Sequence, residues 1–305
     1  MSRAHAGLRI LVLGNGYAGA RVAGMVASLP GAELAGFATA QPTAEFGDVP
    51  VISPDFLISP PGIAWVRARA PEWLLCINTT VLLPSALLDA LAGKALNCHP
   101  GPLPEYGGLH AHQWAIRHGA RMYGVTVHRI TPRLDAGPIV AIRRFPIRDS
   151  DTGLTLFRTA LVQGVLLLTT VTTRLVDGEM LAETRQDPHA LRLYRHREAL
   201  DGRIDWRLPA RALIDFVRAG NYEPLQSPTY TASFVTPSGA TVEVLRCAPA
   251  GETRAAPGTW LGLHAGAPVI ACGDGQALTL VRARVDGRIL NATTWRDLIR
   301  EASHA

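Results

Sequence analysis

Residues 8–19 read LRILVLGNGYAG, and this stretch decides the fold. The run Leu8–Leu13 is dominated by apolar residues and predicts a buried strand, and residues 14–16 predict a turn. Residues 18–29 have a helical composition that ends before Pro30 and Gly31. A buried strand, a tight turn and a helix form the repeating unit of a parallel α/β sheet.

The same alternation continues along the first half of the chain. Further strands are expected at residues 33–39, 73–77 and 95–98, and further helices at 63–69, 84–91, 111–118 and 155–175. Two more strands, at 123–129 and 139–145, are expected to be antiparallel at the far edge of the sheet. The fold class predicted is therefore α/β, with a doubly wound, mostly parallel sheet.

The pattern changes at about Pro209. A helix over 210–218 is followed by short alternating runs at 230–235, 241–245, 268–272 and 277–281, separated by Gly, Pro and Asp. This predicts a small C-terminal β-rich domain. The domains expected are 1–185, a linker over 186–208, and 209–305.

Composition limits the classes of protein that need to be considered. The chain has 305 residues, of which 48% are hydrophobic, enough for packed cores. Its net charge of +5 comes almost entirely from scattered arginines, with Lys94 the only lysine, so a nucleic-acid surface is not expected. The four cysteines are widely spaced and read as free thiols. The apolar runs are too short to span a membrane and no signal-peptide core precedes Leu8, so a cytoplasmic protein with no membrane partner is expected.

A second stretch, LNCHPGPLPEYGG at residues 96–108, carries the candidate chemistry. Its prolines stiffen a loop that follows a strand. Asn97 and His99 are two positions apart, so on a strand end their side chains point the same way. A carboxamide donor beside a titratable base suits acyl transfer to an amine. Asp135 lies in a turn between strands and could fold back over this strand end.

The motif GNGYAG at 14–19 matches the GxGxxG fingerprint of nicotinamide dinucleotide enzymes. That fingerprint also needs an acidic residue at the end of the second strand, and residues 36–40 read GFATA. We therefore interpret the glycines as a tight, closely packed turn and keep an NAD(P)-dependent oxidoreductase as an alternative. A pure binding module without catalytic activity is another class that the motif alone does not separate.

Four motifs in order resemble the folate-dependent formyltransferases, the superfamily that includes methionyl-tRNA formyltransferase. They are Asn-x-His-Pro from Asn97, Leu-Pro-x-Tyr from Leu103, Gly-Val-Thr-x-His from Gly124 and Leu-Asp-x-Gly from Leu134. Residues 257–275 resemble the C-terminal, OB-like domain of the transfer-RNA and sugar enzymes. The resemblance implies a Rossmann-like formyltransferase fold over nearly the whole chain.

The resemblance also implies roles. Asn97 would donate to the formyl oxygen, His99 would stabilise that oxygen or handle the amine proton, and Asp135 would orient His99. The formyl donor would be 10-formyltetrahydrofolate, and no metal is required. The folate-binding residues implied are Leu82, Leu83, Pro84, Arg133, Leu134 and Asp135. The substrate-binding residues implied are Pro102, Tyr106, Gly108, His110 and His112. His128 is expected to be structural, and Cys98 to face away from the site.

The acceptor amine is the open question. Where the transfer-RNA enzyme has Tyr-Arg-Gly-Ala-Ala-Pro, this chain has Tyr-Gly-Gly-Leu-His-Ala from Tyr106. That form is similar to formyltransferases of siderophore and peptide pathways. The main hypothesis is a primary amine or hydroxylamine of a small metabolite, free or carrier-bound, such as a hydroxyornithine-like amino acid or an amino-sugar nucleotide. The alternatives are methionyl-tRNA formyltransferase and formyltetrahydrofolate hydrolase. The sequence leaves the oligomeric state open.

Overall fold

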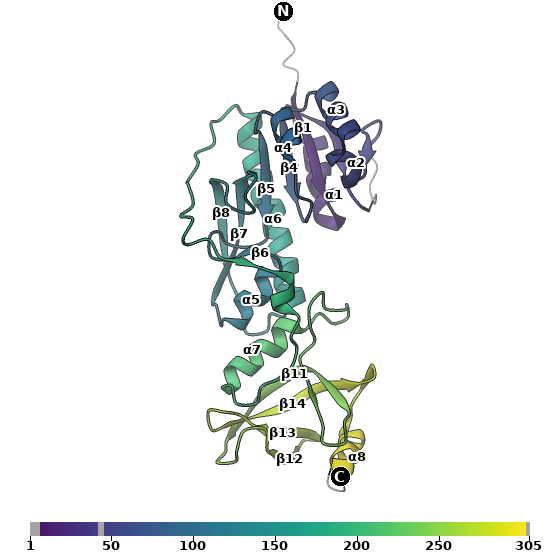
Figure 1. Ribbon diagram of the computed structural model, residues 1–305, viewed down its shortest axis with the longest axis vertical. Coiled ribbons are helices and arrows are strands. Elements are labelled where there is room, and N and C mark those ends of the chain that lie inside the picture. The colour runs from purple at the N-terminus through teal and green to yellow at the C-terminus, as the bar shows by residue number, and fades with distance from the viewer. Residues whose placement is uncertain (1–6, 42–45, 303–305) are drawn as a thin grey trace, which may run out of the picture. The chain divides into compact units, whose positions relative to one another are not determined.

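The computed structural model describes residues 7–41 and 46–302 (Figure 1). The chain divides into two compact units, and each is made of several segments. The first unit comprises Met1–Gly108, Met122–Pro146 and Phe157–Leu193, and the second comprises Leu109–Arg121, Ile147–Leu156 and Tyr194–Ala305. Two segments of the first half of the chain thus belong to the second unit, while the domain boundaries at 185 and 209 stay a prediction.

The first unit contains a seven-stranded sheet in the order β3-β2-β1-β4-β5-β7-β8 within the described residues. Its strands are β1 (Leu8–Gly14), β2 (Ala32–Ala38), β3 (Val51–Ile52), β4 (Trp73–Ile77), β5 (Ala95–His99), β7 (Met122–Arg129) and β8 (Ile139–Pro146). The first five strands in this order are parallel, β7 is antiparallel to β5, and β8 is antiparallel to β7. The expected doubly wound sheet with an antiparallel edge is confirmed.

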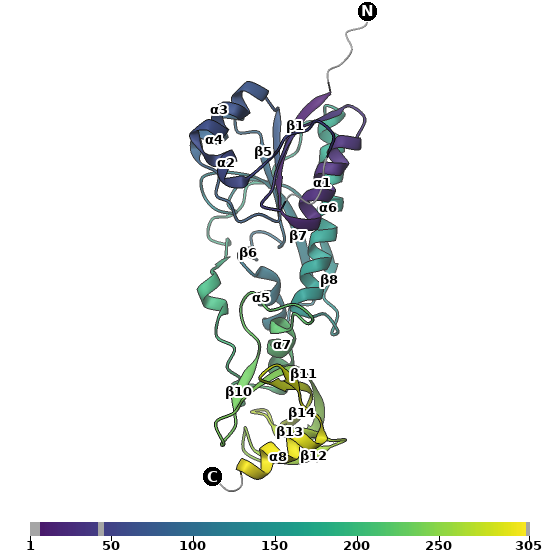
Figure 2. The same ribbon diagram turned by 90° about the vertical axis from the view of Figure 1, so that its right-hand side faces the viewer.

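Helices cover both faces of this sheet, with α1 and α6 on one side and α2, α3 and α4 on the other (Figure 2). Their bounds are α1 (Gly16–Ser28), α2 (Pro54–Ile58), α3 (Pro60–Arg69), α4 (Ser85–Ala90) and α6 (Gly153–Val176). The central strand β4 is buried along its whole length, as expected for a strand covered on both faces. Leu57, Val66 and Leu87, from α2, α3 and α4, belong to one buried cluster with residues of β1 and β4.

The α2–α3 region begins earlier than the sequence pattern predicts. The expected helix starts at Ile63, whereas α3 starts at Pro60, directly after α2. Ser53 and Ser59 cap the two helices by accepting backbone N–H groups at 3.1 and 3.2 Å. Because proline lacks an N–H group and has a helical φ, it fits the first turn of a helix. The two proline positions are therefore helix starts and not a loop.

The glycines of residues 14–19 let β1 and α1 pack closely. A Cβ atom on Gly19 would lie 2.3 Å from the backbone of Gly14, and one on Gly14 would lie 2.8 Å from the carbonyl oxygen of Ile77. The side chain of Asn15 accepts the N–H of Ala40 at 2.9 Å, which ties this turn to the end of β2. Side chains at positions 14 and 19 would therefore force the turn apart.

Helix α6 is long and apolar enough to span a membrane by length and composition, and no other described helix passes that test. The sequence analysis expected no run of this kind. Gly164 in α6 faces the sheet, where its Cβ position is 3.0 Å from the Sγ of Cys98. Leu156, Leu168 and Val171 of α6 are at most 1% exposed, so this face of the helix packs inside the protein. The contact also confirms that Cys98 points away from the face that carries Asn97 and His99.

The second unit combines helices with an antiparallel sheet. Its helices are α5 (Ala111–Arg117), η1 (His196–Ala199), α7 (Ala210–Gly220) and α8 (Ala292–Ala302). Its sheet has the order β10-β11-β14-β13-β12, with β15 paired to β14. The strands are β10 (Ser233–Val235), β11 (Thr241–Glu252), β12 (Trp260–His264), β13 (Ala267–Ala271), β14 (Gln276–Val285) and β15 (Arg288–Ile289). The β-rich C-terminal domain is confirmed, although β12, β15 and α8 were not expected.

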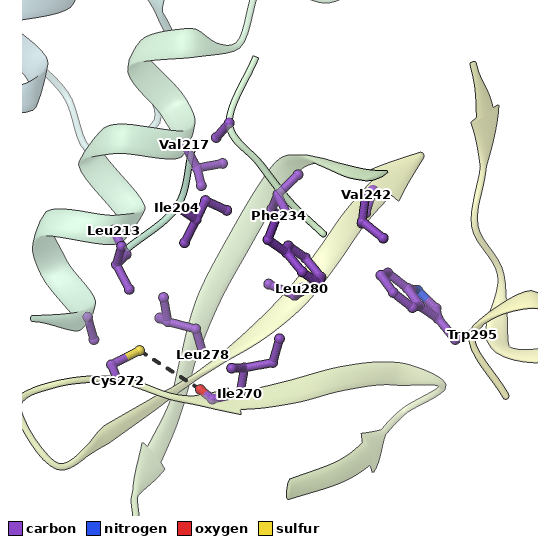
Figure 3. Close-up of a cluster of buried hydrophobic side chains, with 14 of the residues drawn as sticks. Ile204, Leu213, Val217, Phe234, Val242, Ile270, Cys272, Leu278, Leu280 and Trp295 are labelled. Carbon is purple, nitrogen blue, oxygen red and sulfur yellow. Dashed lines mark hydrogen bonds between the residues drawn. The ribbon is translucent and has the colours of Figure 1, made fainter. Parts of the chain in front are cut away.

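The core of the second unit lies between α7 and this sheet (Figure 3). Leu213 and Val217 of α7 share a buried cluster with Ile270, Leu278 and Leu280 of the strands. Burial of side chains of this size contributes about 1.5–3 kcal/mol each. Two further short strands are β6 (Gly107–Gly108) and β9 (Leu193–Tyr194).

Candidate active site

The candidate site is built at the carboxyl end of β5, where Asn97 and His99 lie on one face of the strand. In the register of β5 with β7, Asn97 pairs with His128 and His99 with Thr126. Because directly paired residues of neighbouring strands share a face of the sheet, Asn97 and His128 lie side by side. His99 is 4% exposed, so its imidazole works in a largely water-free environment.

The loop after β5 determines which nitrogen of His99 carries the proton. The Nε2 of His99 lies 2.7 Å from the carbonyl oxygen of Tyr106. A carbonyl oxygen only accepts, so this contact requires a proton on Nε2. In the neutral ring, Nδ1 is then an unprotonated nitrogen that can accept a proton. Burial lowers the pKa of His99 and outweighs the opposing effects of Asp135 and the Tyr106 carbonyl, so the neutral ring dominates at neutral pH.

Gly101 makes this contact possible. A Cβ atom at position 101 would lie 2.3 Å from the carbonyl oxygen of Tyr106 and 2.7 Å from the Nε2 of His99. Both distances are too short for nonbonded contact, so any side chain would displace the two hydrogen-bonded groups. The glycine of the predicted motif therefore has a steric role at the imidazole.

Two side chains of β7 form hydrogen bonds with the backbone of the same loop. The hydroxyl of Tyr123 donates to the carbonyl of Pro100 at 2.5 Å. The hydroxyl of Thr126 donates to the carbonyl of Gly101 at 2.8 Å and accepts the N–H of Leu103 at 3.0 Å. Thr126 is fully buried, so leaving these backbone groups unpaired would be costly. The loop is thus held in one conformation by buried hydrogen bonds.

Asp135 reaches His99 from the connection between β7 and β8. Its Oδ2 lies 3.5 Å from the Nδ1 of His99 and accepts the N–H of Gly108 at 2.8 Å. Its Oδ1 lies 3.6 Å from the Nε2 of His128. Burial pushes the pKa of Asp135 upward, but the positive charge that His99 and His128 carry when they are protonated, together with the N–H of Gly108, outweighs it and lowers the pKa to about 2. Asp135 is therefore a buried carboxylate at neutral pH.

His128 is part of the same cluster. Its Nδ1 lies 2.8 Å from the carbonyl oxygen of Arg129 and so carries a proton. Its Nε2 lies 3.1 Å from the Nδ2 of Asn97, so in the neutral ring it accepts an N–H of that amide. The expectation that His128 is merely structural missed this link between Asn97 and Asp135. The antiparallel pairing of the two motif-bearing strands is the signal that could have found it.

The residues expected to bind folate lie on two loops of the first unit. Leu82 and Leu134 are 71% and 46% exposed, which is unusual for leucines. Leu83 packs against the same buried cluster as Ile130, the residue before the loop that carries Arg133. Pro84 is the N-cap of α4. The two loops thus start from one core and present apolar side chains at their tips.

The expected substrate-binding residues separate into two groups. Pro102, Tyr106 and Gly108 belong to the first unit, where the Tyr106 ring meets that of Tyr123 edge-on and Gly108 donates to Asp135. His110 and His112 belong to the second unit.

His112 is 4% exposed, its Nε2 pairs with the hydroxyl of Tyr222, and burial with the nearby His110 lowers its pKa to about 3. These are the surroundings of a core residue, and the assignment of His112 to substrate binding stays a prediction. His110 pairs with His196 at 2.8 Å, and burial and His196 lower its pKa to about 4. Among the described residues, no group of three or more His, Cys, Asp or Glu side chains could hold a metal ion.

Comparisons with known proteins show which family the chain belongs to. Residues 35–172 match the family model described as formyl transferase, and residues 198–297 match the formyl transferase C-terminal domain. A methionyl-tRNA formyltransferase of Anaeromyxobacter sp. (strain K) is 32% identical over 251 residues, covering 79% of this chain and 75% of the relative. Another, from Pseudomonas syringae pv. syringae, is 33% identical over 241 residues, covering 79% and 73%.

Solved structures show the same fold. An N-formyltransferase of Helicobacter canadensis, in complex with folinic acid and dTDP-3-aminofucose, superimposes with a TM-score of 0.65 at 15% identity, covering 90% of this chain and 98% of that one. HypX of Aquifex aeolicus in complex with tetrahydrofolic acid gives a TM-score of 0.61 at 22% identity, covering 96% and 47%.

The strand end carries a half-buried amide beside a buried imidazole and a buried carboxylate, and the matching family models describe a formyl transferase, which is a one-carbon group transferase. The chain belongs to the formyltransferase family, as its motifs predicted.

Proposed function

We propose that this enzyme moves a formyl group from 10-formyltetrahydrofolate to an amine, using Asn97, His99 and Asp135. The observation that carries the proposal is the arrangement around Asp135. Its carboxylate lies 3.5 Å from the Nδ1 of His99, whose Nε2 proton is already committed to a backbone carbonyl. His99 can therefore accept one proton on its Nδ1, and the Asp135 carboxylate beside it supplies the opposite charge.

The chemistry follows from these three side chains. A primary amide carries two N–H bonds, so the one that Asn97 does not use toward His128 can donate to the formyl oxygen as negative charge builds on it. The attacking amine forms the new C–N bond and loses its proton to the Nδ1 of His99. Asp135 stabilises the resulting imidazolium. Collapse of the tetrahedral intermediate then breaks the bond to the folate nitrogen, which leaves with a proton from His99.

The folate donor would lie against the two loops that carry Leu82, Leu83, Pro84, Arg133 and Leu134. The exposed apolar side chains at the loop tips support this placement, because a flat pterin ring needs apolar contact area. The neighbours in Helicobacter canadensis and Aquifex aeolicus were solved with folinic acid and tetrahydrofolic acid. A cytoplasmic location belongs to the same proposal.

The first acceptor to test is methionyl-tRNA. The curated relatives at 32% and 33% identity are methionyl-tRNA formyltransferases, and they match the chain across both family domains. This favours the transfer-RNA alternative over the small-metabolite hypothesis with which the sequence analysis began.

A specific observation keeps a small amine as the second candidate. The arginine of the transfer-RNA enzyme's loop is replaced here by Gly107. A Cβ atom at this position would lie 2.9 Å from the Cδ2 of Leu193 and 3.3 Å from the carbonyl oxygen of Arg192. An arginine side chain would therefore need the Leu193 side chain to shift and the backbone at Arg192 to give slightly. The amine of an amino-sugar nucleotide or of a hydroxyornithine-like amino acid is consistent with this smaller loop.

A turnover assay separates these possibilities. Purified enzyme is given 10-formyltetrahydrofolate with charged initiator tRNA, an amino-sugar nucleotide or N-hydroxyornithine, and formation of the formylated product is followed by mass spectrometry. Rapid turnover of one acceptor identifies the substrate class, and folate product formed without any acceptor identifies a hydrolase. Binding of folate with no folate product under any condition would refute the proposal.

A further inference from the structure

The segment over residues 184–193 includes the start of the predicted linker. It forms backbone hydrogen bonds with the loop after β5 and with the start of β8, close to the turn that carries Asp135. Thr184 and Ile139 exchange two backbone hydrogen bonds of 2.8 Å each. At the other end of the segment, Arg192 donates its N–H to Pro104 at 3.0 Å and accepts that of Gly107 at 2.9 Å. All of these residues belong to the first unit. The segment is therefore largely exposed but is tied to the site near both of its ends by backbone hydrogen bonds.

Gln186 lies in the middle of this segment and bonds directly to the turn that carries Asp135. Its Nε2 donates to the carbonyls of Asp135 and Gly137, at 2.7 Å each. Two carbonyl oxygens accept only, so the nitrogen and not the oxygen of the amide must face them. The Oε1 of Gln186 is buried and has no hydrogen-bond partner within the described residues. The side chain therefore acts here as a double donor.

The turn that Gln186 holds has an unusual backbone conformation. Asp135 has a φ of +50°, in the left-handed region that residues other than Gly, Asn and Asp rarely adopt. In this conformation its side chain meets Gly108 and His99 while its carbonyl meets Gln186. Hydrogen bonds on the carbonyls of Asp135 and of Gly137, two positions later, hold the turn on the C-terminal side of the Asp135 side chain.

We propose that Gln186 is a positioning residue, which holds the Asp135 turn so that the carboxylate stays beside the Nδ1 of His99. This inference rests on the proposed function, since it assigns Gln186 to the same reaction. Gln186 touches no reacting atom, and its effect passes through Asp135. When its two hydrogen bonds are lost, the turn can relax and the carboxylate can move away from the imidazole.

The variants Gln186→Met and Gln186→Glu test this. Methionine fills a similar volume but cannot donate, and an ionised glutamate places negative charge against two carbonyls. The matched control is Glu183→Gln, because Glu183 lies on the same stretch of chain and its carboxylate pairs with the Arg129 side chain at 2.5 Å, whereas the carbonyls of Asp135 and Gly137 bond to Gln186. We expect kcat to fall about 10-fold or more in Q186M and further in Q186E, with KM changed less than about threefold. E183Q should stay within about twofold of the wild type.

A double-mutant cycle distinguishes positioning from general damage. If Gln186 acts through Asp135, then Q186M should cost almost nothing further in a D135N background. An equal loss of kcat in both backgrounds, or wild-type kcat in Q186M alone, would overturn the inference.

A second measurement does not depend on the catalytic activity of the variants. The pKa of His99 is read by NMR titration of its ring signals in the wild type, Q186M, E183Q and D135N. Moving the carboxylate from 3.5 Å to about 5 Å should lower this pKa by about one unit, toward the D135N value. A His99 pKa in Q186M equal to that of the wild type refutes the positioning role even if the enzyme formylates normally. A shifted pKa in a protein that forms no formylated or folate product refutes the proposed function instead.

Discussion

Replacing Asp135 by asparagine removes one charge from the candidate site and little else. Asparagine has nearly the same shape, and its Oδ1 can still accept the N–H of Gly108, which Asp135 now binds at 2.8 Å. What is lost is the carboxylate 3.5 Å from the Nδ1 of His99. The variant therefore isolates the electrostatic contribution of Asp135 to the protonated imidazole.

The size of that contribution can be worked out from the distance. With an effective dielectric constant of about 20, two unit charges at 3.5 Å attract by about 5 kcal/mol. The amide dipole of asparagine recovers part of this, so we expect a loss of about 3–4 kcal/mol at the transition state. This corresponds to a fall in kcat/KM of about 10²- to 10³-fold.

The assay is the initial rate of formylation at pH 5–9 with the acceptor found by turnover screening. Because Asp135 raises the pKa of His99 against the effect of burial, its removal lowers that pKa further. The acid limb of the pH–rate profile should therefore move to lower pH as the maximal rate falls. A D135N enzyme within tenfold of the wild-type rate, with an unshifted acid limb, would refute the assigned role.

Three further predictions follow from the contacts in the structure. Gly101→Ala should lower kcat at least about 10-fold, because its Cβ would disrupt the contact between His99 and Tyr106. The control is Gly24→Ala in helix α1, whose Cβ would meet Phe46 at 3.5 Å. This variant should retain activity, and its free energy of unfolding in urea should rise by about 0.5–1 kcal/mol. Gly19→Ala should lower the melting temperature by several degrees, and NAD(P) should not raise that of the wild type; stabilisation by micromolar cofactor would revive the oxidoreductase alternative. The pKa of Asp135 is lowered to about 2 from an ordinary 3.8, so the ionised carboxylate contributes about 2 kcal/mol to the free energy of unfolding. This contribution is present above about pH 4 and is lost as the pH falls toward 2. Urea unfolding should show this extra acid destabilisation in the wild type but not in D135N.

Much of the fold followed from local patterns. The alternation of apolar strands and helices in the first half predicted the sheet and its antiparallel edge, because a buried parallel strand needs an apolar run and a covering helix. The start of α3 at Pro60 was missed because a proline-rich stretch usually indicates a loop, and only the serine caps show otherwise. In the second unit, β12 was missed because Trp260–His264 is a mixed run whose pairing with β13 makes it a strand.

The candidate site was predicted in part. Asn97 and His99 could be placed on one face from their spacing alone, and the resemblance to formyltransferases pointed to Asp135. His128 and Gln186 were beyond local reasoning. His128 joins the site because β7 pairs antiparallel with β5 in the register that puts it beside Asn97. Gln186 lies in a polar stretch that resembles a linker, and its role depends on a hydrogen bond across 51 positions of the chain.

The sequence alone determined which side chains share a face at the candidate site. The period of a strand places Asn97 and His99 on one face and Cys98 on the opposite face. It also determined the family, through the four motifs that resemble those of the formyltransferases. Only the tertiary structure decided how these groups are arranged, because it sets the 2.7 Å contact that places the proton on the Nε2 of His99 and the backbone turn that brings Asp135 to its Nδ1. Those properties depend on distances between segments far apart in the chain, which no local pattern encodes.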